Sequence, residues 1–270
     1  MEIKLDGVRI SIVLDEDFYG EKFWKRIEAG TYEPDTLQFI RLNCTTDTLF
    51  IDIGAANGAM TLLAARYGSK VIAYEPNPLM FLILNRNLLS NPELNQKVTS
   101  YQRAISDVKR EIEFSVESNS KILSSIVFSQ DLSSQGKIKV DSLSEILTKL
   151  STENLKIIIK MDIEGAEWQI LKNVETLQSL KLHKAKLLLA LHPGFYRPHR
   201  SKIPIIARIS FEFFRFRNLL DSIELYRNLS RFAHICRTNL VPVNSKFKFM
   251  MLVAAGYHEF IVDFAELEVE

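Results

Sequence analysis

Hydrophobic and polar side chains alternate through the first 15 residues, which is the pattern of strands with one buried face. The alternation continues on both sides of Asp6-Gly7, a dipeptide typical of a tight β-hairpin turn. Residues 20–42 then carry apolar side chains at helical spacing, interrupted by Gly30 and Pro34. We therefore expect a β-hairpin followed by two short helices that cap a sheet.

Farther along the chain, apolar runs of strand length alternate with segments of helical periodicity. The predicted strands lie near residues 48–53, 70–75, 97–104, 156–162 and 185–191. The predicted helices lie near residues 58–67, 78–89, 142–150 and 165–173. An edge strand is predicted at Glu111–Val116, and a C-terminal antiparallel hairpin is predicted from Phe247–Ala254, a turn at Gly256 and Phe260–Phe264. Strands that alternate with helices predict an α/β fold, with a doubly wound, mostly parallel sheet and helices on both faces.

One strand–turn–helix–strand unit, from Phe50 to Pro78, places an acid at the end of each strand. The first strand ends in Asp52, and Gly54 follows where the chain must turn sharply and adopt a positive φ. Gly58 allows the first helical turn to approach a ligand or the sheet closely. The second strand ends in Glu75, close to the roughly 20-residue spacing at which an acid reaches ribose hydroxyls. This unit predicts a site for an adenosine-containing cofactor.

The glycine pattern of this unit bears on which cofactor binds. Dinucleotide-binding dehydrogenases use G-x-G-x-x-G, whose tight turn brings a helix N-terminus to a pyrophosphate. Here the pattern is D-x-G-x-x-x-G, and Ala56 stands in place of the middle glycine. The looser loop suits a ligand without a pyrophosphate, such as S-adenosylmethionine.

Composition narrows the class of protein. The 270 residues are 47% hydrophobic and 25% charged, which is ordinary for a soluble globular protein. The formal net charge of +1 gives no overall field toward nucleic acid, so we expect no nucleic-acid partner. The N-terminal residues lack the order of a signal peptide, and no apolar run approaches the ~18 residues of a transmembrane segment. Cys44 and Cys236 are far apart, and we expect reduced thiols in a cytoplasmic protein.

Four segments together resemble the FkbM family of S-adenosylmethionine-dependent methyltransferases. They are Asp52–Gly58, Glu75-Pro76-Asn77, Ala104-Ile-Ser-Asp107 and Lys160-Met-Asp-Ile-Glu-Gly-Ala-Glu167. The resemblance runs from about Tyr32 to about Pro193, with the family's asparagine displaced by one position at Ala56-Asn57. It implies a Rossmann-like class I methyltransferase sheet with an antiparallel strand near the C-terminus. We expect effectively one domain: a hairpin and capping helices in residues 1–45, and the methyltransferase domain in residues 46–270.

The resemblance also implies which residues bind S-adenosylmethionine. Its methionine end would lie against the loop, and its ribose hydroxyls would bind Glu75, with Pro76 and Asn77 shaping the adenosine side. The loop residues of this set are Asp52, Gly54, Ala55, Asn57 and Gly58. Ser106 and Asp107 resemble the adenine-side loop, although Asp107 is equally suited to a hairpin turn.

Methyl transfer to an alcohol needs a base, because a hydroxyl is a weak nucleophile. Asp162 and Glu164 follow one predicted strand and His192 ends another, so a base with its orienting acid is expected there. Helix capping is an alternative role for Glu164 and, more strongly, for Glu167, and a structural hydrogen bond is an alternative for His192. A magnesium ion on Asp162 is compatible with the sequence, but hard cations need about six oxygen ligands, so we favour catalysis without a metal.

Residues 195–232 form a basic and aromatic segment whose role stays open. An apolar helical stripe is predicted at Ile209, Phe213, Phe216, Leu220 and Ile223. The segment is a core-facing helix, a lid in which Tyr196 and Arg197 contact an anionic acceptor, or a membrane-surface helix for a lipid-linked one. Ser124 and Ser125 resemble a serine segment of the family and are further candidates for contact with the substrate.

By this resemblance the expected reaction is O-methylation of a hydroxyl on a sugar, a glycan or a related small molecule. One alternative is an NAD-dependent oxidoreductase, against which the missing central glycine counts. A nucleic-acid methyltransferase is a second alternative, disfavoured by the weak net charge and by Asp162-Ile-Glu-Gly165 where such enzymes often carry an Asn/Asp-Pro-Pro-aromatic segment. A non-catalytic, methyltransferase-like binding module is a third.

Overall fold

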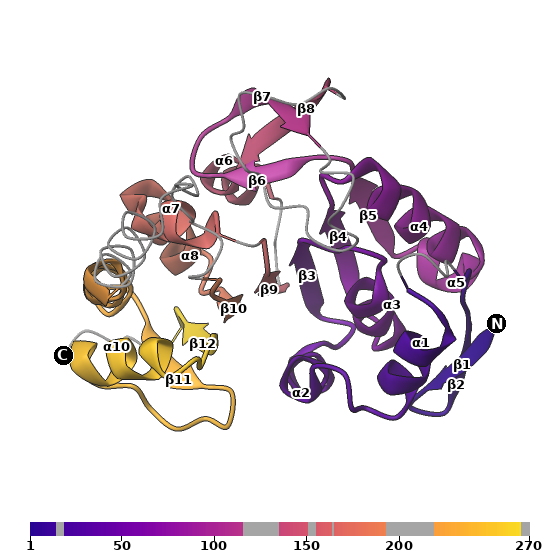
Figure 1. The fold of residues 1–270 in the computed structure, drawn as a ribbon, viewed down its shortest axis with the longest axis horizontal. Coiled ribbons are helices and arrows are strands. Elements are labelled where there is room, and N and C mark those ends of the chain that lie inside the picture. The colour runs from indigo at the N-terminus through magenta and orange to yellow at the C-terminus, as the bar shows by residue number, and fades with distance from the viewer. Residues whose placement is uncertain (15–18, 116–134, 151–154, 164, 193–218, 266–270) are drawn as a thin grey trace, which may run out of the picture.

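A computed structural model of the chain describes residues 1–14, 19–115, 135–150, 155–163, 165–192 and 219–265. Within these ranges the main sheet has seven strands, in the order β11-β12-β10-β9-β3-β4-β5 (Figure 1). Its strands are β3 (Thr48–Ile53), β4 (Lys70–Tyr74), β5 (Val98–Tyr101), β9 (Lys156–Met161), β10 (Lys186–Ala190), β11 (His234–Arg237) and β12 (Glu259–Asp263). The five strands from β5 to β10 are parallel, and β12 is antiparallel to both of its neighbours. The structure thus confirms the predicted doubly wound, mostly parallel α/β fold with an antiparallel strand near the C-terminus.

Helices cover both faces of this sheet. Side chains alternate between the two faces along each strand, so apolar residues on both faces need to be buried. All six residues of β3 are buried, with Phe50 in one hydrophobic cluster and Ile51 in the other. The Phe50 cluster is covered by α1 (Glu21–Glu28), α2 (Pro34–Asn43), α3 (Ala59–Arg66) and α4 (Pro78–Leu89). The Ile51 cluster is covered by α6 (Leu143–Lys149), α7 (Glu167–Lys172), α8 (Val174–Leu182) and α10 (Lys246–Ala254). A short helix, α5 (Pro92–Asn95), precedes β5.

The N-terminal hairpin forms as predicted. β1 (Glu2–Leu5) and β2 (Val8–Ser11) pair antiparallel, and both turn residues have positive φ, 47° at Asp6 and 84° at Gly7. That geometry favours Asp-Gly, which explains why the sequence signal was reliable. The hairpin packs in the same hydrophobic cluster as α1, α2 and Phe50, so this region shares its core with the main sheet.

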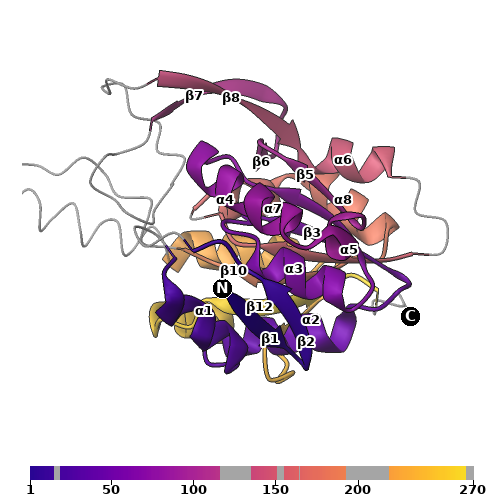
Figure 2. The same cartoon turned by 90° about the vertical axis from the view of Figure 1, so that its right-hand side faces the viewer.

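A second, three-stranded sheet lies outside the main one, in the order β6-β8-β7 (Figures 1 and 2). It contains β6 (Ala104–Ser106), β7 (Arg110–Ser115) and β8 (Gln135–Ser142), and β7 is an edge strand as predicted. The single strand predicted at 97–104 is wrong, because β5 ends at Tyr101 and β6 begins in the other sheet. Arg103 at this break donates to Asp141 of β8 over 2.7 Å, which ties the turn to the second sheet.

The predicted C-terminal hairpin is also wrong in one arm. Residues Lys246–Ala254 form the helix α10, and β12 pairs instead with β10 and β11. Phe249 and Val253 face the core from positions i and i+4, and Ser245 caps the helix by accepting from the Phe247 amide over 3.3 Å. Because this segment is apolar on several sides, its sequence does not distinguish the periodicity of a helix from that of a strand. The prediction of a strand was therefore not excluded by the sequence.

Residues 219–229 are helical, and the helix buries Ser222, Leu225 and Leu229. Leu220, part of the predicted apolar stripe, is 51% exposed, so the buried face is shifted from the predicted one. The stripe residues before position 219 lie outside the described residues. None of the described helices is both long and apolar enough to cross a membrane.

Candidate active site

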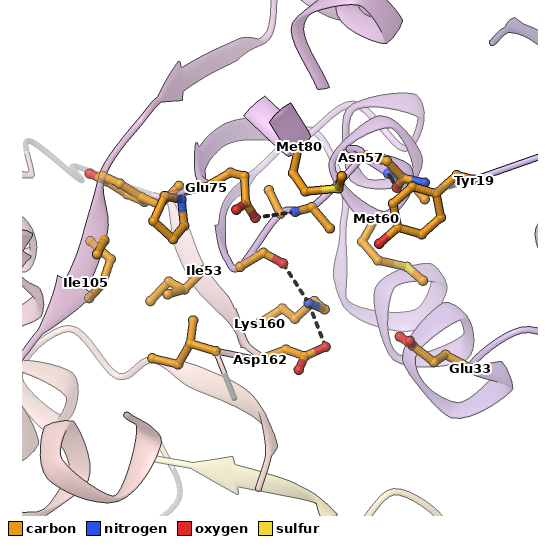
Figure 3. A pocket seen from close by; sticks show the side chains of 18 of the residues that line it. Tyr19, Glu33, Ile53, Asn57, Met60, Glu75, Met80, Ile105, Lys160 and Asp162 are labelled. Carbon is orange, nitrogen blue, oxygen red and sulfur yellow. Dashed lines mark hydrogen bonds and ion pairs between the residues drawn. The ribbon is translucent and has the colours of Figure 1, made fainter. Parts of the chain in front are cut away.

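A cavity of about 280 Å³ lies at the carboxyl ends of β3, β4 and β9, where open α/β sheets bind ligands (Figure 3). The loop after β3 lines it, together with residues that follow β4, β5, β9 and β10. Of the predicted site residues, it is lined by Gly54, Ala55, Asn57, Glu75, Pro76, Asp162 and His192. The structure therefore brings together predicted residues that are as far apart in the sequence as Gly54 and His192.

The loop after β3 can only be built with glycine at two positions. Gly54 has φ +84°, and a Cβ there would lie 2.0 Å from the carbonyl oxygen of Asp162. Gly58 has φ +86°, and a Cβ there would lie 2.5 Å from Cδ1 of Leu84. Ala56 between them also has a positive φ of 47°, which costs a residue with a side chain about 1–2 kcal/mol. The floor of the cavity is thus bare backbone held in a strained turn.

Glu75 fixes that loop from the end of β4. Its Oε2 accepts from the amide of Ala56 and its Oε1 from the amide of Asn77, each over 2.8 Å. Burial raises the pKa of Glu75 to about 7, since desolvation outweighs the two amide hydrogen bonds that favour the charged form. A carboxylate has about four lone-pair sites, so two remain for hydroxyl groups of a ligand.

Lys160 of β9 shares its charge among several carboxylates at the floor of the cavity (Figure 3). Its Nζ lies 3.3 Å from Asp162 Oδ2 and 3.7 Å from Asp52 Oδ1, and it donates to the Gly54 carbonyl over 3.3 Å. Burial lowers the pKa of Lys160, but the negative charges of Asp162, Asp52 and Glu33 raise it more, so the lysine stays charged. Burial raises the pKa of Asp52, which lies behind the cavity wall.

His192 lies between two acids beside the same cavity. Its Nδ1 is 3.1 Å from Glu167 Oε1, and its Nε2 is 3.5 Å from Asp162 Oδ1. Glu167 is fully buried, and it also accepts from the amides of Ile163 over 3.1 Å and Gly165 over 2.7 Å. Glu167 therefore holds the loop after β9 without capping α7 by a hydrogen bond, and it also contacts the histidine, which the sequence did not reveal.

Five predicted cofactor residues do not line the cavity. Asp52 and Gly58 lie behind the loop. The side chain of Asn77 accepts from the Leu79 amide over 2.9 Å and caps α4. Ser106 donates to Asp107 over 2.8 Å, and Gln169 donates to the same Asp107 oxygen over 2.8 Å. Asp107 therefore joins β6 to α7 at this position, beside the cavity and not in it.

Several other candidates cannot be placed. Glu164, Ser124, Ser125, Tyr196 and Arg197 lie outside the described residues. Among the side chains that the structure describes, no group of three or more His, Cys, Asp or Glu residues is arranged to hold a metal ion.

One wall of the cavity was missed by sequence reasoning because it comes from the N-terminal region. Tyr19, Phe23, Tyr32 and Glu33 line it. The Phe23 ring lies 4.5 Å from the Tyr19 ring and 4.7 Å from the Tyr32 ring, between ring centroids. Only long-range packing brings these residues to the carboxyl ends of the strands, so no local sequence motif predicts their position.

Comparison with known families identifies the chain. The sheet order and the cavity at its carboxyl edge are those of a Rossmann-like methyltransferase. The family described as the methyltransferase FkbM domain matches residues 52–226, well over half of the 270 residues. The chain belongs to this family.

Solved structures of other methyltransferases show more distant likenesses. Methyltransferase FkbM from Methylobacillus flagellatus KT is 15% identical with a TM-score of 0.44, and the match covers 93% of this chain and 56% of that protein. A second likeness is to geranyl diphosphate C-methyltransferase from Streptomyces coelicolor A3(2), solved with Mg²⁺, geranyl diphosphate and S-adenosyl-L-homocysteine. It is 12% identical with a TM-score of 0.41, and the match covers 94% of this chain and 91% of that protein. At these TM-scores the likenesses carry no argument about substrate. No curated protein matches the chain significantly.

Proposed function

We propose that the protein is an S-adenosylmethionine-dependent O-methyltransferase that acts on a hydroxyl group of a sugar, a glycan or a related small molecule. The observation that carries the proposal is the position of His192. It lies between Asp162 and Glu167, beside the cavity that is floored by the glycine loop and Glu75. A base next to a cofactor site is what methyl transfer to a hydroxyl requires. Family membership favours this reaction class over an oxidoreductase.

The residues present fit S-adenosylmethionine. Because Gly54 and Ala55 expose bare or nearly bare backbone, the methionine end can approach the loop closely. The remaining lone pairs of Glu75 would accept from the ribose hydroxyls, and Pro76 lines the cavity next to it. When bound, the cofactor supplies a methyl group on a positively charged sulfur. The protein must then orient the acceptor and remove its proton.

His192 is the proposed base. In the tautomer whose Nδ1–H donates to Glu167, Nε2 carries the lone pair and takes the proton of the acceptor hydroxyl. Glu167 holds the ring in that orientation, and the nearby carboxylate of Asp162 stabilises the imidazolium that forms. Glu164, an additional candidate, remains a prediction from the sequence.

We expect His192→Ala to lower kcat for methyl transfer by about 10²–10⁴-fold, because the hydroxyl loses its base. Transfer from S-adenosylmethionine to a panel of sugar acceptors measures this, and S-adenosylhomocysteine binding should change little. His234→Ala is the matched control, since His234 is exposed on β11. Full turnover by the His192 variant would contradict the assigned base. If the wild-type protein binds cofactor and methylates nothing in a broad screen, the non-catalytic module becomes the better account.

A further inference from the structure

The N-terminal wall of the cavity carries a carboxylate that no motif explains. The family match begins at residue 52, yet Glu33 lines the cavity together with Tyr19, Phe23 and Tyr32. Glu33 is therefore supplied by a region of the chain outside the matched residues. Its place at the cavity depends on how the first two helices pack against the sheet.

The backbone at Glu33 is strained. Glu33 has φ 42° and ψ 59°, a left-handed conformation that costs a residue with a side chain about 1–3 kcal/mol. It precedes α2, but its side chain makes no capping hydrogen bond with that helix. Figure 3 shows the carboxylate directed toward the side of the cavity where Lys160 and Asp162 lie. Strain of this kind that aims a side chain into a cavity is typical of a ligand-binding residue.

Carboxylates outnumber the one buried lysine near Glu33. Three carboxylates, those of Glu33, Asp52 and Asp162, act on the single charge of Lys160. The nearby Arg103 is held by Asp141 at 2.7 Å. Burial raises the pKa of Glu33; Lys160 opposes that effect, Asp162 adds to it, and a hydrogen bond with Tyr32 opposes it. A positively charged group of a ligand would offset this excess of negative charge.

An unpartnered donor on the same side of the cavity points to a ligand independently. The Oδ1 of Asn57 accepts from the Ala59 amide over 3.1 Å, which leaves Nδ2 as the donor of this side chain. Asn57 is 2% exposed, and its Nδ2 has no hydrogen-bond partner among the described residues. Figure 3 shows Asn57 and Glu33 on the same side of the site, both across from Glu75. Two residues that line the cavity on the side opposite Glu75 thus carry a carboxylate acceptor and a buried donor without a described partner.

We infer that Glu33 binds the α-ammonium group of the methionine end of S-adenosylmethionine, while Asn57 Nδ2 donates to its carboxylate. This rests on the proposed function, which places the ribose hydroxyls on Glu75. In the cofactor the ribose lies between the adenine and the charged amino-acid group, so ribose hydroxyls bound to Glu75 leave the amino-acid group to extend toward the opposite side of the cavity. Glu33 is then a cofactor-binding residue, and the N-terminal region completes the cofactor site.

The test compares two ligands that differ in the amino-acid end. S-Adenosylhomocysteine carries the α-ammonium and carboxylate, whereas 5′-methylthioadenosine keeps the adenosine and thioether and lacks both. Calorimetric titrations of the full chain give Kd for each ligand with wild-type protein, Glu33→Gln and Asn57→Asp. Asn57→Asp keeps the Oδ1 acceptor but removes the donor and adds a negative charge. Asp35→Asn is the matched control, because Asp35 is exposed on α2 and hydrogen-bonds to Thr238.

We expect each of the two variants to weaken S-adenosylhomocysteine by about tenfold or more and 5′-methylthioadenosine by less than about twofold. Unchanged S-adenosylhomocysteine binding by Glu33→Gln overturns the inference and leaves the proposed function intact. Equal weakening of both ligands also overturns it, because Glu33 would then act on the shape of the pocket. If the wild-type protein binds neither ligand, the proposed function falls and this inference with it.

Discussion

At the scale of single residues, the site depends on polar groups that the fold buries and then orients through backbone amides. Glu75 and Glu167 are both nearly or fully buried, and each accepts two amide hydrogen bonds from loops that border the cavity. Such carboxylates hold loop geometry as well as bind ligands. Their substitution therefore affects stability and function together, and the two effects must be measured separately.

Glu75 makes the stability of the ligand-free protein depend on pH. Its folded-state pKa of about 7 lies above its ordinary value of 4.5, so the protonated form stabilises the fold. That contribution is complete below about pH 4.5 and is lost as pH rises through about 7. We expect Glu75→Gln to flatten the fall in unfolding free energy between about pH 4.5 and 7, the window between these two pKa values, as measured by denaturant titration.

Part of the slope should persist in that variant, since burial also raises the pKa of Glu259 to about 7. The exposed acid Glu93 provides the control, as Glu93→Gln. An unchanged slope in the Glu75 variant would show that its carboxylate ionises normally in the folded protein.

Substitutions at two nearby positions of the loop after β3 should change the stability of the protein in opposite directions. Gly54→Ala forces a Cβ to 2.0 Å from a carbonyl oxygen, so we expect a loss of roughly 3 kcal/mol or more. Ala56→Gly relieves a positive φ and should stabilise the protein by about 0.5–1 kcal/mol. Thermal and denaturant unfolding measure both. Destabilisation by Ala56→Gly would mean that the methyl group contributes packing that outweighs the strain.

At the scale of elements, the N-terminal helices are held to the sheet by a few buried side chains. Leu37 of α2 is 1% exposed and packs in the cluster that contains Phe50, whereas Leu42 of the same helix is 69% exposed. We expect Leu37→Ala to cost about 2–5 kcal/mol of unfolding free energy and to weaken cofactor binding, because α2 carries Glu33 at its start. Leu42→Ala should stay within about 0.5 kcal/mol of wild type. Similar losses in both variants would show that α2 is not anchored by this face.

Elements with local signals could be predicted from the sequence, and those defined by distant contacts could not. Asn77-Pro78 starts α4 at the expected residue, because the cap and the proline act within one turn. The break at Arg103 depends on Asp141, and the contact of Glu167 with His192 joins two elements that pack only in the folded chain. The motif Lys160–Glu167 indicated that these residues matter, but only the fold shows that Glu167 touches the histidine.

At the scale of the whole molecule, residues from Tyr19 to His192 converge on one cavity. The family's matched region supplies the loop, Glu75, Asp162 and His192, while residues before it supply an aromatic and acidic wall. The proposed site is thus divided between residues inside the family match and a wall from the residues before it.

The most direct test of the account is calorimetric titration of the purified protein with S-adenosylhomocysteine and, separately, with NADH, each with and without magnesium. The account predicts binding of S-adenosylhomocysteine in the micromolar range, no binding of NADH, and no dependence on magnesium. Binding of NADH alone, or of neither ligand, would contradict it.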